Sequence, residues 1–155
     1  MAEKEAWFAG LIDGEGCFTL SIYRQHGHTL RFDMVFSISM KEGPWFGEVS
    51  RILGLHDIGF NWRPRRNQIE VHVEGHQRVK KLISVVIPYL VVKKPLATRL
   101  LDFPKAPLRN RFKSIDRNYL DEICEVVDFV RRFNKGKNRR HKWNSETIKE
   151  FYGIK

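Results

Sequence analysis

The sequence predicts an α+β fold in which helices cover one face of a four-stranded antiparallel sheet. Two neighbouring segments, 18–25 and 30–39, alternate apolar and polar residues as half-buried strands do. A second alternating pair follows within 58–73. Apolar residues at helical spacing precede, separate and follow the two pairs. The expected order is therefore αββαββα, followed by C-terminal helices.

The first helix is expected over residues 5–13, where Trp7, Phe8, Leu11 and Ile12 have helical spacing. Gly14 and Gly16 are expected to end it. The first hairpin then turns at His26-Gly27-His28.

Trp45 to Leu53 form a second helical stripe, which Gly54 ends. After the second hairpin, a helix is expected from about His76 to Ile87, and Pro88 and Pro95 bracket a non-helical stretch. Later helices are expected over 117–133 and from Ser145 onward. We expect one domain over 1–155, with the αββαββα core at 1–103 and C-terminal helices with a basic loop at 104–155.

The formal net charge of +10 indicates a polyanionic partner, most simply nucleic acid. An anionic membrane would suit the charge, but no basic amphipathic helix with an aromatic face is present, and no apolar run is long enough to span a bilayer. No signal or transit peptide is recognised. Cys17 and Cys124 lack metal-ligand spacing and are expected to be reduced. We therefore expect an intracellular protein of a prokaryotic cytoplasm or an organelle.

The segment Phe8-Ala9-Gly10-Leu11-Ile12-Asp13-Gly14-Glu15-Gly16 places two carboxylates at the negative end of a helix dipole. Anions there are disfavoured by roughly 0.3–1 kcal/mol each. A bound cation removes this conflict, and hard oxygen ligands suit Mg²⁺. The alternative is that Gly14 and Gly16 only cap the helix and Glu15 is simply solvated.

Gly10 and Gly14 are four residues apart and share one helix face, where another backbone can approach closely. If the partner were the same helix of a second copy, two Glu15 carboxylates would meet, and metal ions would relieve their repulsion.

The nonapeptide FAGLIDGEG resembles the LAGLIDADG motif of homing endonucleases. One copy near the N-terminus and the αββαββα order resemble the single-motif, homodimeric branch of that family. The resemblance implies metal binding by Glu15 and by the Gly14 carbonyl, with Asp13 holding the helix end. It implies Mg²⁺ as cofactor, with Mn²⁺ or Ca²⁺ able to occupy the same sites. Its implied dimer interface comprises Trp7, Gly10, Leu11, Asp13 and Gly14.

The segment Pro88-Tyr89-Leu90-Val91-Val92-Lys93-Lys94 resembles the family segment that brings a basic residue to the active site. Lys93 is the position carried over, as a catalytic cation that stabilises charge on the scissile phosphate. The alternative is that Lys93 and Lys94 contact only the DNA backbone or solvent. The family also often has a polar residue after the second strand that orders water near the metals. Here Ser39 or Met40 occupies that position, so we expect either that Ser39 or Lys41 substitutes or that the water is held otherwise.

The polar faces of both hairpins have the form of an antiparallel ribbon that reads the DNA major groove. Asp33 and Glu70 are expected either to accept from cytosine or to anchor neighbouring arginines. The run Arg131 to Lys142 resembles the family's phosphate-gripping loop, with a solvated linker as the alternative. The full set of DNA-binding candidates is Ser21, Tyr23, Gln25, Arg31, Asp33, Ser37, Ser39, Lys41, Asn61, Arg63, Arg65, Gln68, Glu70, His72, Lys94, Lys135, Lys137, Arg139, Arg140 and Lys142.

The resemblance implies a sequence-specific double-strand DNA homing endonuclease, encoded in an intron. It would act as a homodimer on a long pseudo-palindromic site, hydrolyse phosphodiesters with divalent metal and leave short 3′ overhangs. Two alternatives remain open: a maturase that binds its intron RNA, and a non-catalytic DNA-binding regulator on the same fold.

Overall fold

A computed structural model describes residues 1–25, 29–104, 116–134 and 142–154. The helices and strands follow the predicted order, with one additional helix. Their bounds are α1 Ala2–Glu15, β1 Gly16–Gln25, β2 Thr29–Lys41, α2 Pro44–Leu55, β3 Asn61–Arg65, β4 Gln68–Glu74, α3 His76–Val86, α4 Lys94–Leu101, α5 Arg117–Phe133 and α6 Ser145–Phe151.

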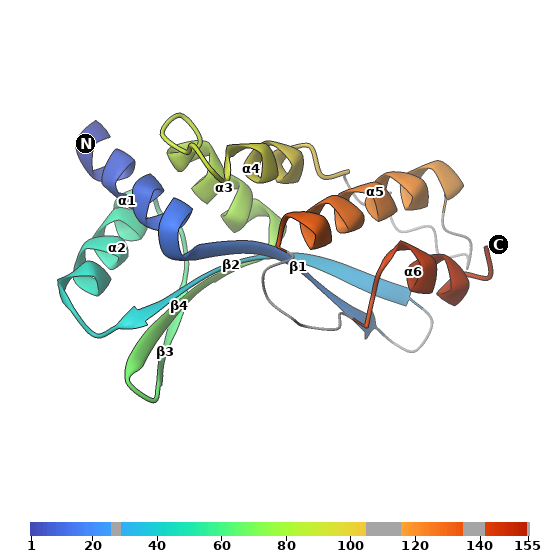
Figure 1. Ribbon diagram of the computed structural model, residues 1–155, viewed down its shortest axis with the longest axis horizontal. Coiled ribbons are helices and arrows are strands. Elements are labelled where there is room, and N and C mark those ends of the chain that lie inside the picture. The colour runs from blue at the N-terminus through green and yellow to red at the C-terminus, as the bar shows by residue number, and fades with distance from the viewer. Residues whose placement is uncertain (26–28, 105–115, 135–141, 155) are drawn as a thin grey trace.

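The four strands form one antiparallel sheet in the order β1-β2-β4-β3. Figure 1 shows the helices on one side of this curved sheet, with the β3–β4 hairpin extending away from them. The predicted α+β fold class is therefore confirmed. The other face of the sheet carries no helix among the described residues, and this leaves the polar side chains of the strands accessible.

The core lies between the sheet and the helices and begins with the first helix. Phe8, Ala9 and Ile12 of α1 are fully buried. Phe8 packs edge-on against Phe36 of β2 at a ring distance of 6.3 Å, and Phe18 of β1 lies 5.1 Å from the same ring. Burial of these aromatic rings fixes α1 across the sheet, and with it the residues at the helix end.

Two sequence predictions about the elements were wrong, and one helix was missed. Gly14 does not end the first helix, which continues to Glu15 and is capped by Gly16. Ile58 is buried but precedes β3, which begins only at Asn61. The stretch between Pro88 and Pro95 is non-helical up to Lys93, as expected, but α4 was not predicted; it begins at Lys94 with Pro95 in its first turn, where proline is compatible with a helix.

The outer edge of β1 is sealed by two side chains near the end of α5. Asn134 Nδ2 donates to the Phe18 carbonyl at 2.9 Å, and Arg131 Nη2 donates to the Leu20 carbonyl at 3.3 Å. Because β1 is an edge strand, these carbonyls would otherwise be available for pairing with another chain. Among the described residues, no helix is long and apolar enough to cross a bilayer.

Replacing Phe36 by alanine should lower the free energy of unfolding by roughly 3–5 kcal/mol, because the ring is fully buried between Phe8 and Phe18. Urea unfolding measures this change. The same truncation at Phe133, whose ring is partly exposed, is the control and should cost less than half as much. Equal losses at both positions would contradict the core described here.

Candidate active site and nucleic-acid interface

The end of α1 presents an exposed carboxylate at the start of the sheet. Glu15 is the last helical residue and is exposed, and β1 begins at the next residue. Gly14 beside it is also exposed. The helix directs its partial negative charge toward this end, and no basic residue lies in its last turn. The local electrostatics therefore favour a cation next to Glu15.

Asp13 fastens the loop after α3 to this helix end. Its carboxylate accepts hydrogen bonds from the backbone N–H groups of Val91 at 2.7 Å, Val92 at 3.1 Å and Lys93 at 2.8 Å. Burial alone would raise the pKa of Asp13, but the three N–H donors and the Lys93 charge outweigh it and lower the pKa below its ordinary value. Asp13 is thus a charged clamp at neutral pH, in line with the holding role expected for it.

The same clamp brings Lys93 to the helix end. The Lys93 ammonium group donates to the backbone carbonyl of Asp13, two residues before Glu15. A carboxylate and an ammonium from segments about 80 residues apart therefore meet at one end of α1. The neighbouring Lys94 is exposed at the first position of α4.

The donor set at this helix end fits a hard divalent cation that is only partly coordinated by one chain. Among the described residues, no group of three or more His, Cys, Asp or Glu side chains could hold a metal ion. Mg²⁺ usually keeps several waters and binds one or two carboxylates together with substrate phosphates. The Glu15 carboxylate and the Gly14 carbonyl supply oxygen ligands of the required kind.

One side of α1 faces outward and combines two apolar side chains with two glycines. Trp7 is 42% exposed on this side, and Leu11 is half-buried beside it. A Cβ added to Gly10 or Gly14 would meet no atom within 4 Å. We call Trp7, Gly10, Leu11 and Gly14 the glycine face. It is open to another molecule along its whole length.

All strand residues predicted to contact DNA lie on the face of the sheet that no described helix covers. The pairing sets Ser21 opposite Asp33, Ser37 opposite His72 and Arg63 opposite Glu70. Because side chains alternate between the faces of a strand, the other candidates in register share that side. This polar face comprises Ser21, Tyr23, Gln25, Arg31, Asp33, Ser37, Ser39, Lys41, Asn61, Arg63, Arg65, Gln68, Glu70 and His72.

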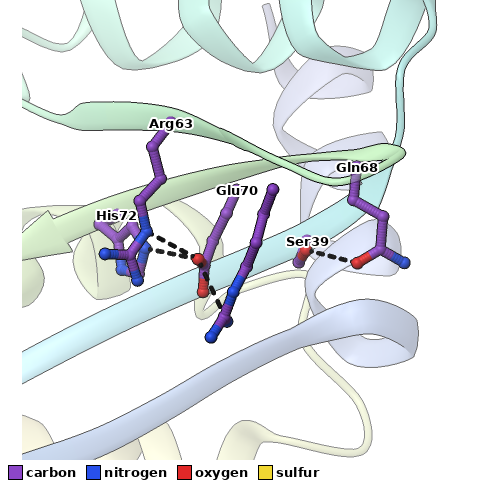
Figure 2. A network of polar contacts seen from close by, with 6 residues as sticks. Ser39, Arg63, Gln68, Glu70 and His72 are labelled. Atoms are coloured by element: carbon purple, nitrogen blue, oxygen red, sulfur yellow. Dashed lines mark hydrogen bonds and ion pairs between the residues drawn. The ribbon is translucent and has the colours of Figure 1, made fainter.

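The two acids of the polar face each bind neighbouring donors. Asp33 accepts from the Tyr23 hydroxyl at 2.8 Å and from Arg31 Nε at 3.1 Å. Glu70 is surrounded by Arg63, Arg65 and His72 (Figure 2). Of the two roles left open by the sequence, the structure places both acids as anchors for arginines.

The structure shows which residues at the end of β2 lie on the polar face of the sheet. Met40 packs against the core and therefore points toward the helices. Ser39 lies on the polar face, where its hydroxyl donates to Gln68 Oε1 at 3.0 Å (Figure 2). Lys41 is exposed at the end of β2. Ser39 and Lys41 thus remain the polar groups available there, and Met40 is excluded.

The basic C-terminal run is described only in part. Lys135, Lys137, Arg139 and Arg140 lie outside the described residues. Lys142 is exposed, with its ammonium 5.5 Å from the centre of the Trp143 ring. Arg131, at the start of the run, is half-buried: burial lowers its pKa, and it bonds to the Leu20 carbonyl of β1. The phosphate-gripping interpretation therefore does not extend to Arg131.

Sequence reasoning missed several residues that shape the site. Arg131 and Asn134 seal β1, although no local pattern distinguishes them from the basic run that follows. Val91 and Val92 are 79% and 62% exposed beside the end of α1. Trp62 is largely exposed against Phe46, because it lies on the edge strand β3. Tertiary placement, and not residue type, decides these positions.

Comparisons with known proteins agree with the motif and the fold. A model of the LAGLIDADG endonuclease family matches residues 8–107. DNA endonuclease I-CvuI of Chlorella vulgaris is 24% identical over 141 residues, which cover 88% of this chain and 83% of that protein.

Solved structures share the same fold at low sequence identity. The crystal structure of I-CvuI with a DNA target in the presence of Mg matches with a TM-score of 0.79 at 21% identity, covering 98% of this chain and 94% of that one. The archaeal intron-encoded homing endonuclease I-Vdi141I, complexed with DNA, matches with a TM-score of 0.74 at 20% identity, covering 98% and 96%.

Replacing Asp13 by asparagine should destabilise the protein in a pH-dependent way. Because the folded-state pKa of Asp13 lies below its ordinary value of 3.8, the charged clamp contributes stability above that value. The contribution is lost as the pH falls through the lowered pKa. Urea unfolding from about pH 7 to about pH 2 should therefore show a deficit for Asp13→Asn that shrinks in acid. Asp102→Asn, at an exposed position, is the control. A deficit of the same size at every pH would contradict the clamp.

Proposed function

This chain belongs to the LAGLIDADG endonuclease family, and we propose on that basis that it is a homodimeric homing endonuclease. It cuts both strands of a long pseudo-palindromic DNA site, uses divalent metal and leaves short 3′ overhangs. The observation that carries the proposal is the bond from the Lys93 ammonium to the Asp13 carbonyl, which brings this cation to the end of α1 where Glu15 is the last helical residue.

The residues at the helix end divide the chemical work between them. Glu15 and the Gly14 carbonyl hold the metal ion, Mg²⁺ by preference. When bound, this ion supplies Lewis-acid stabilisation of the phosphate and lowers the pKa of its water. The Lys93 ammonium, directed to this end by its bond to the Asp13 carbonyl, stabilises negative charge on the scissile phosphate. Asp13 does not touch the substrate and acts by holding Lys93.

Metal use is further supported by the relative that shares most of this chain. I-CvuI structures were determined with DNA in the presence of Mg and of Ca. In the present chain, the exposed carboxylate at a helix C-terminus gives an independent electrostatic reason for a cation.

Dimerisation through the glycine face brings two active sites together. Two glycines leave room for backbone approach, and Trp7 supplies exposed apolar area. The exposed Val91 and Val92 extend this apolar surface at the loop that carries Lys93. With a two-fold axis between the two copies of α1, each half of a pseudo-palindromic site meets the polar face of one subunit.

Glu15→Gln should abolish cleavage while DNA binding stays largely intact, because the amide lacks the charge that holds the metal. A plasmid carrying the intron-insertion site, incubated with Mg²⁺ or with EDTA, measures cleavage, and gel shift measures binding. Glu122→Gln, at an exposed position on α5, should cut normally. Comparable loss of binding and cleavage in Glu15→Gln, or cutting in EDTA, would count against the assignment.

Gly10→Ala should weaken the dimer although it suits the isolated chain. Alanine favours a helix by roughly 0.5–1 kcal/mol over glycine, and the added Cβ meets nothing within one subunit. In the proposed dimer that Cβ separates the two helices, so the dissociation constant in sedimentation equilibrium should rise about tenfold or more.

Gly47→Ala is the matched control, because Gly47 lies inside α2 with the same open space around it. It should stabilise the fold without changing the dissociation constant. If Gly10→Ala and Gly47→Ala behave alike, the glycine face is not the dimer interface.

A further inference from the structure

Glu70 occupies an unusual position for an acid on a surface that meets DNA. It lies on the polar face of β4 but is only 8% exposed, and it is the sole buried charged or polar residue in the part of the chain that the structure describes. A carboxylate there repels phosphates and also loses hydration. It must therefore be compensated by neighbouring groups.

Three side chains supply that compensation at one oxygen. Glu70 Oε2 lies 2.9 Å from Arg63 Nε, 3.5 Å from Arg65 Nη1 and 3.3 Å from His72 Nε2 (Figure 2). Arg63 stands directly opposite Glu70 across the β3–β4 pair. Burial alone would raise the pKa of Glu70, but the hydrogen bond from Arg63 and the adjacent His72 lower it, so the group is ionised at neutral pH.

The arginines remain accessible while their acid is covered. The side chains of Arg63 and Arg65 are 61% and 59% exposed, against 10% for Glu70. Arg63 is bound through Nε, so the Nη edge of its guanidinium can engage another partner. This edge carries parallel donors that match the O6 and N7 acceptors of guanine.

We propose that Glu70 is a positioning residue that holds Arg63 and Arg65 for reading guanine, so that each half-site carries guanine beneath the β3–β4 hairpin. This inference rests on the proposed DNA recognition by the polar face. Glu70 itself does not read a base, because its covered carboxylate already accepts hydrogen bonds from Arg63 and Arg65. An unrestrained arginine would have to be ordered on binding, at a cost in side-chain entropy. Glu70 orders Arg63 beforehand.

Asp33 provides a natural comparison within the same surface. It anchors Arg31 and Tyr23 on the β1–β2 half of the sheet, while Glu70 acts on the β3–β4 half. The two acids belong to different strands, β2 and β4, and they bind different arginines. Replacing each acid by its isosteric amide, as in Glu70→Gln and Asp33→Asn, should therefore change the base preference at different base pairs of the same half-site.

A binding selection from a randomised duplex DNA pool tests the proposal. Wild type, Glu70→Gln, Arg63→Lys and Asp33→Asn are compared by the base preference at each position. Wild type should enrich guanine beneath β3–β4. Glu70→Gln should reduce that enrichment about fivefold, since a neutral acceptor holds a guanidinium less firmly than a charged one. Asp33→Asn should instead change positions beneath β1–β2.

A double variant separates positioning from direct contact. If Glu70 acts through Arg63, adding Glu70→Gln to Arg63→Lys should cost little further preference at the base pair that Arg63 reads. Additive losses there would overturn the proposal. So would a cytosine preference lost in Glu70→Gln with guanine retained, which would make Glu70 a base reader.

Three further outcomes would also count against the inference. An equal loss at every position in Glu70→Gln, with a lowered melting temperature, would show a merely structural role and overturn the inference. If wild type enriches no sequence at all, the proposed sequence-specific recognition fails and the inference falls with it. If sequence selection is retained but does not depend on Glu70, the inference about Glu70 is wrong while the proposed DNA recognition stands.

Discussion

The bonds from three backbone N–H groups to the Asp13 carboxylate are the interaction on which the candidate active site depends. They join the end of α1 to a loop about 80 residues later in the chain. They place the backbone of Lys93 beside the helix that ends in Glu15, so that the Lys93 ammonium can bond to the Asp13 carbonyl. The helix dipole disfavours an acid at this end, but the Asp13 carboxylate has a structural role there. It fixes the helix end from which Glu15 faces outward.

Charge is distributed over the sheet in an ordered way. A net charge of +10 favours a polyanion, but it does not select a sequence. On the polar face, Asp33 and Glu70 reduce the local positive charge and in return fix the directions of Arg31 and Arg63. The two acids weaken nonspecific attraction to phosphates, but they hold the arginine donors in defined positions. Lys94 and Lys142 lie outside the sheet, where attraction without base selection is sufficient.

Much of the fold and the position of the site could be predicted from the sequence because both rest on local periodicity. Strict alternation located β1 and β2 and assigned the side chains of the polar face correctly. The helix over 117–133 was predicted with its exact bounds and is confirmed. What failed depends on tertiary context: α4, with Pro95 in its first turn, was not predicted, and Gly14 continues α1 because Gly16 provides the cap. The Asp13 bonds, the Glu70 cluster and the Arg131 contact join distant segments, so no sequence window contains them.

The first helix meets three separate requirements, and this explains why its apolar residues do not all lie on one face. Phe8 and Ile12 are buried against the sheet, its end presents Glu15, and Gly10 and Gly14 stay exposed. Each glycine costs a helix roughly 1 kcal/mol relative to alanine, and the surrounding space would admit a Cβ at both positions. Within one chain these glycines are a pure loss of stability. A close neighbour outside the chain would make them useful, and in the proposed dimer a second copy of α1 is that neighbour and would also set two Glu15 side chains side by side.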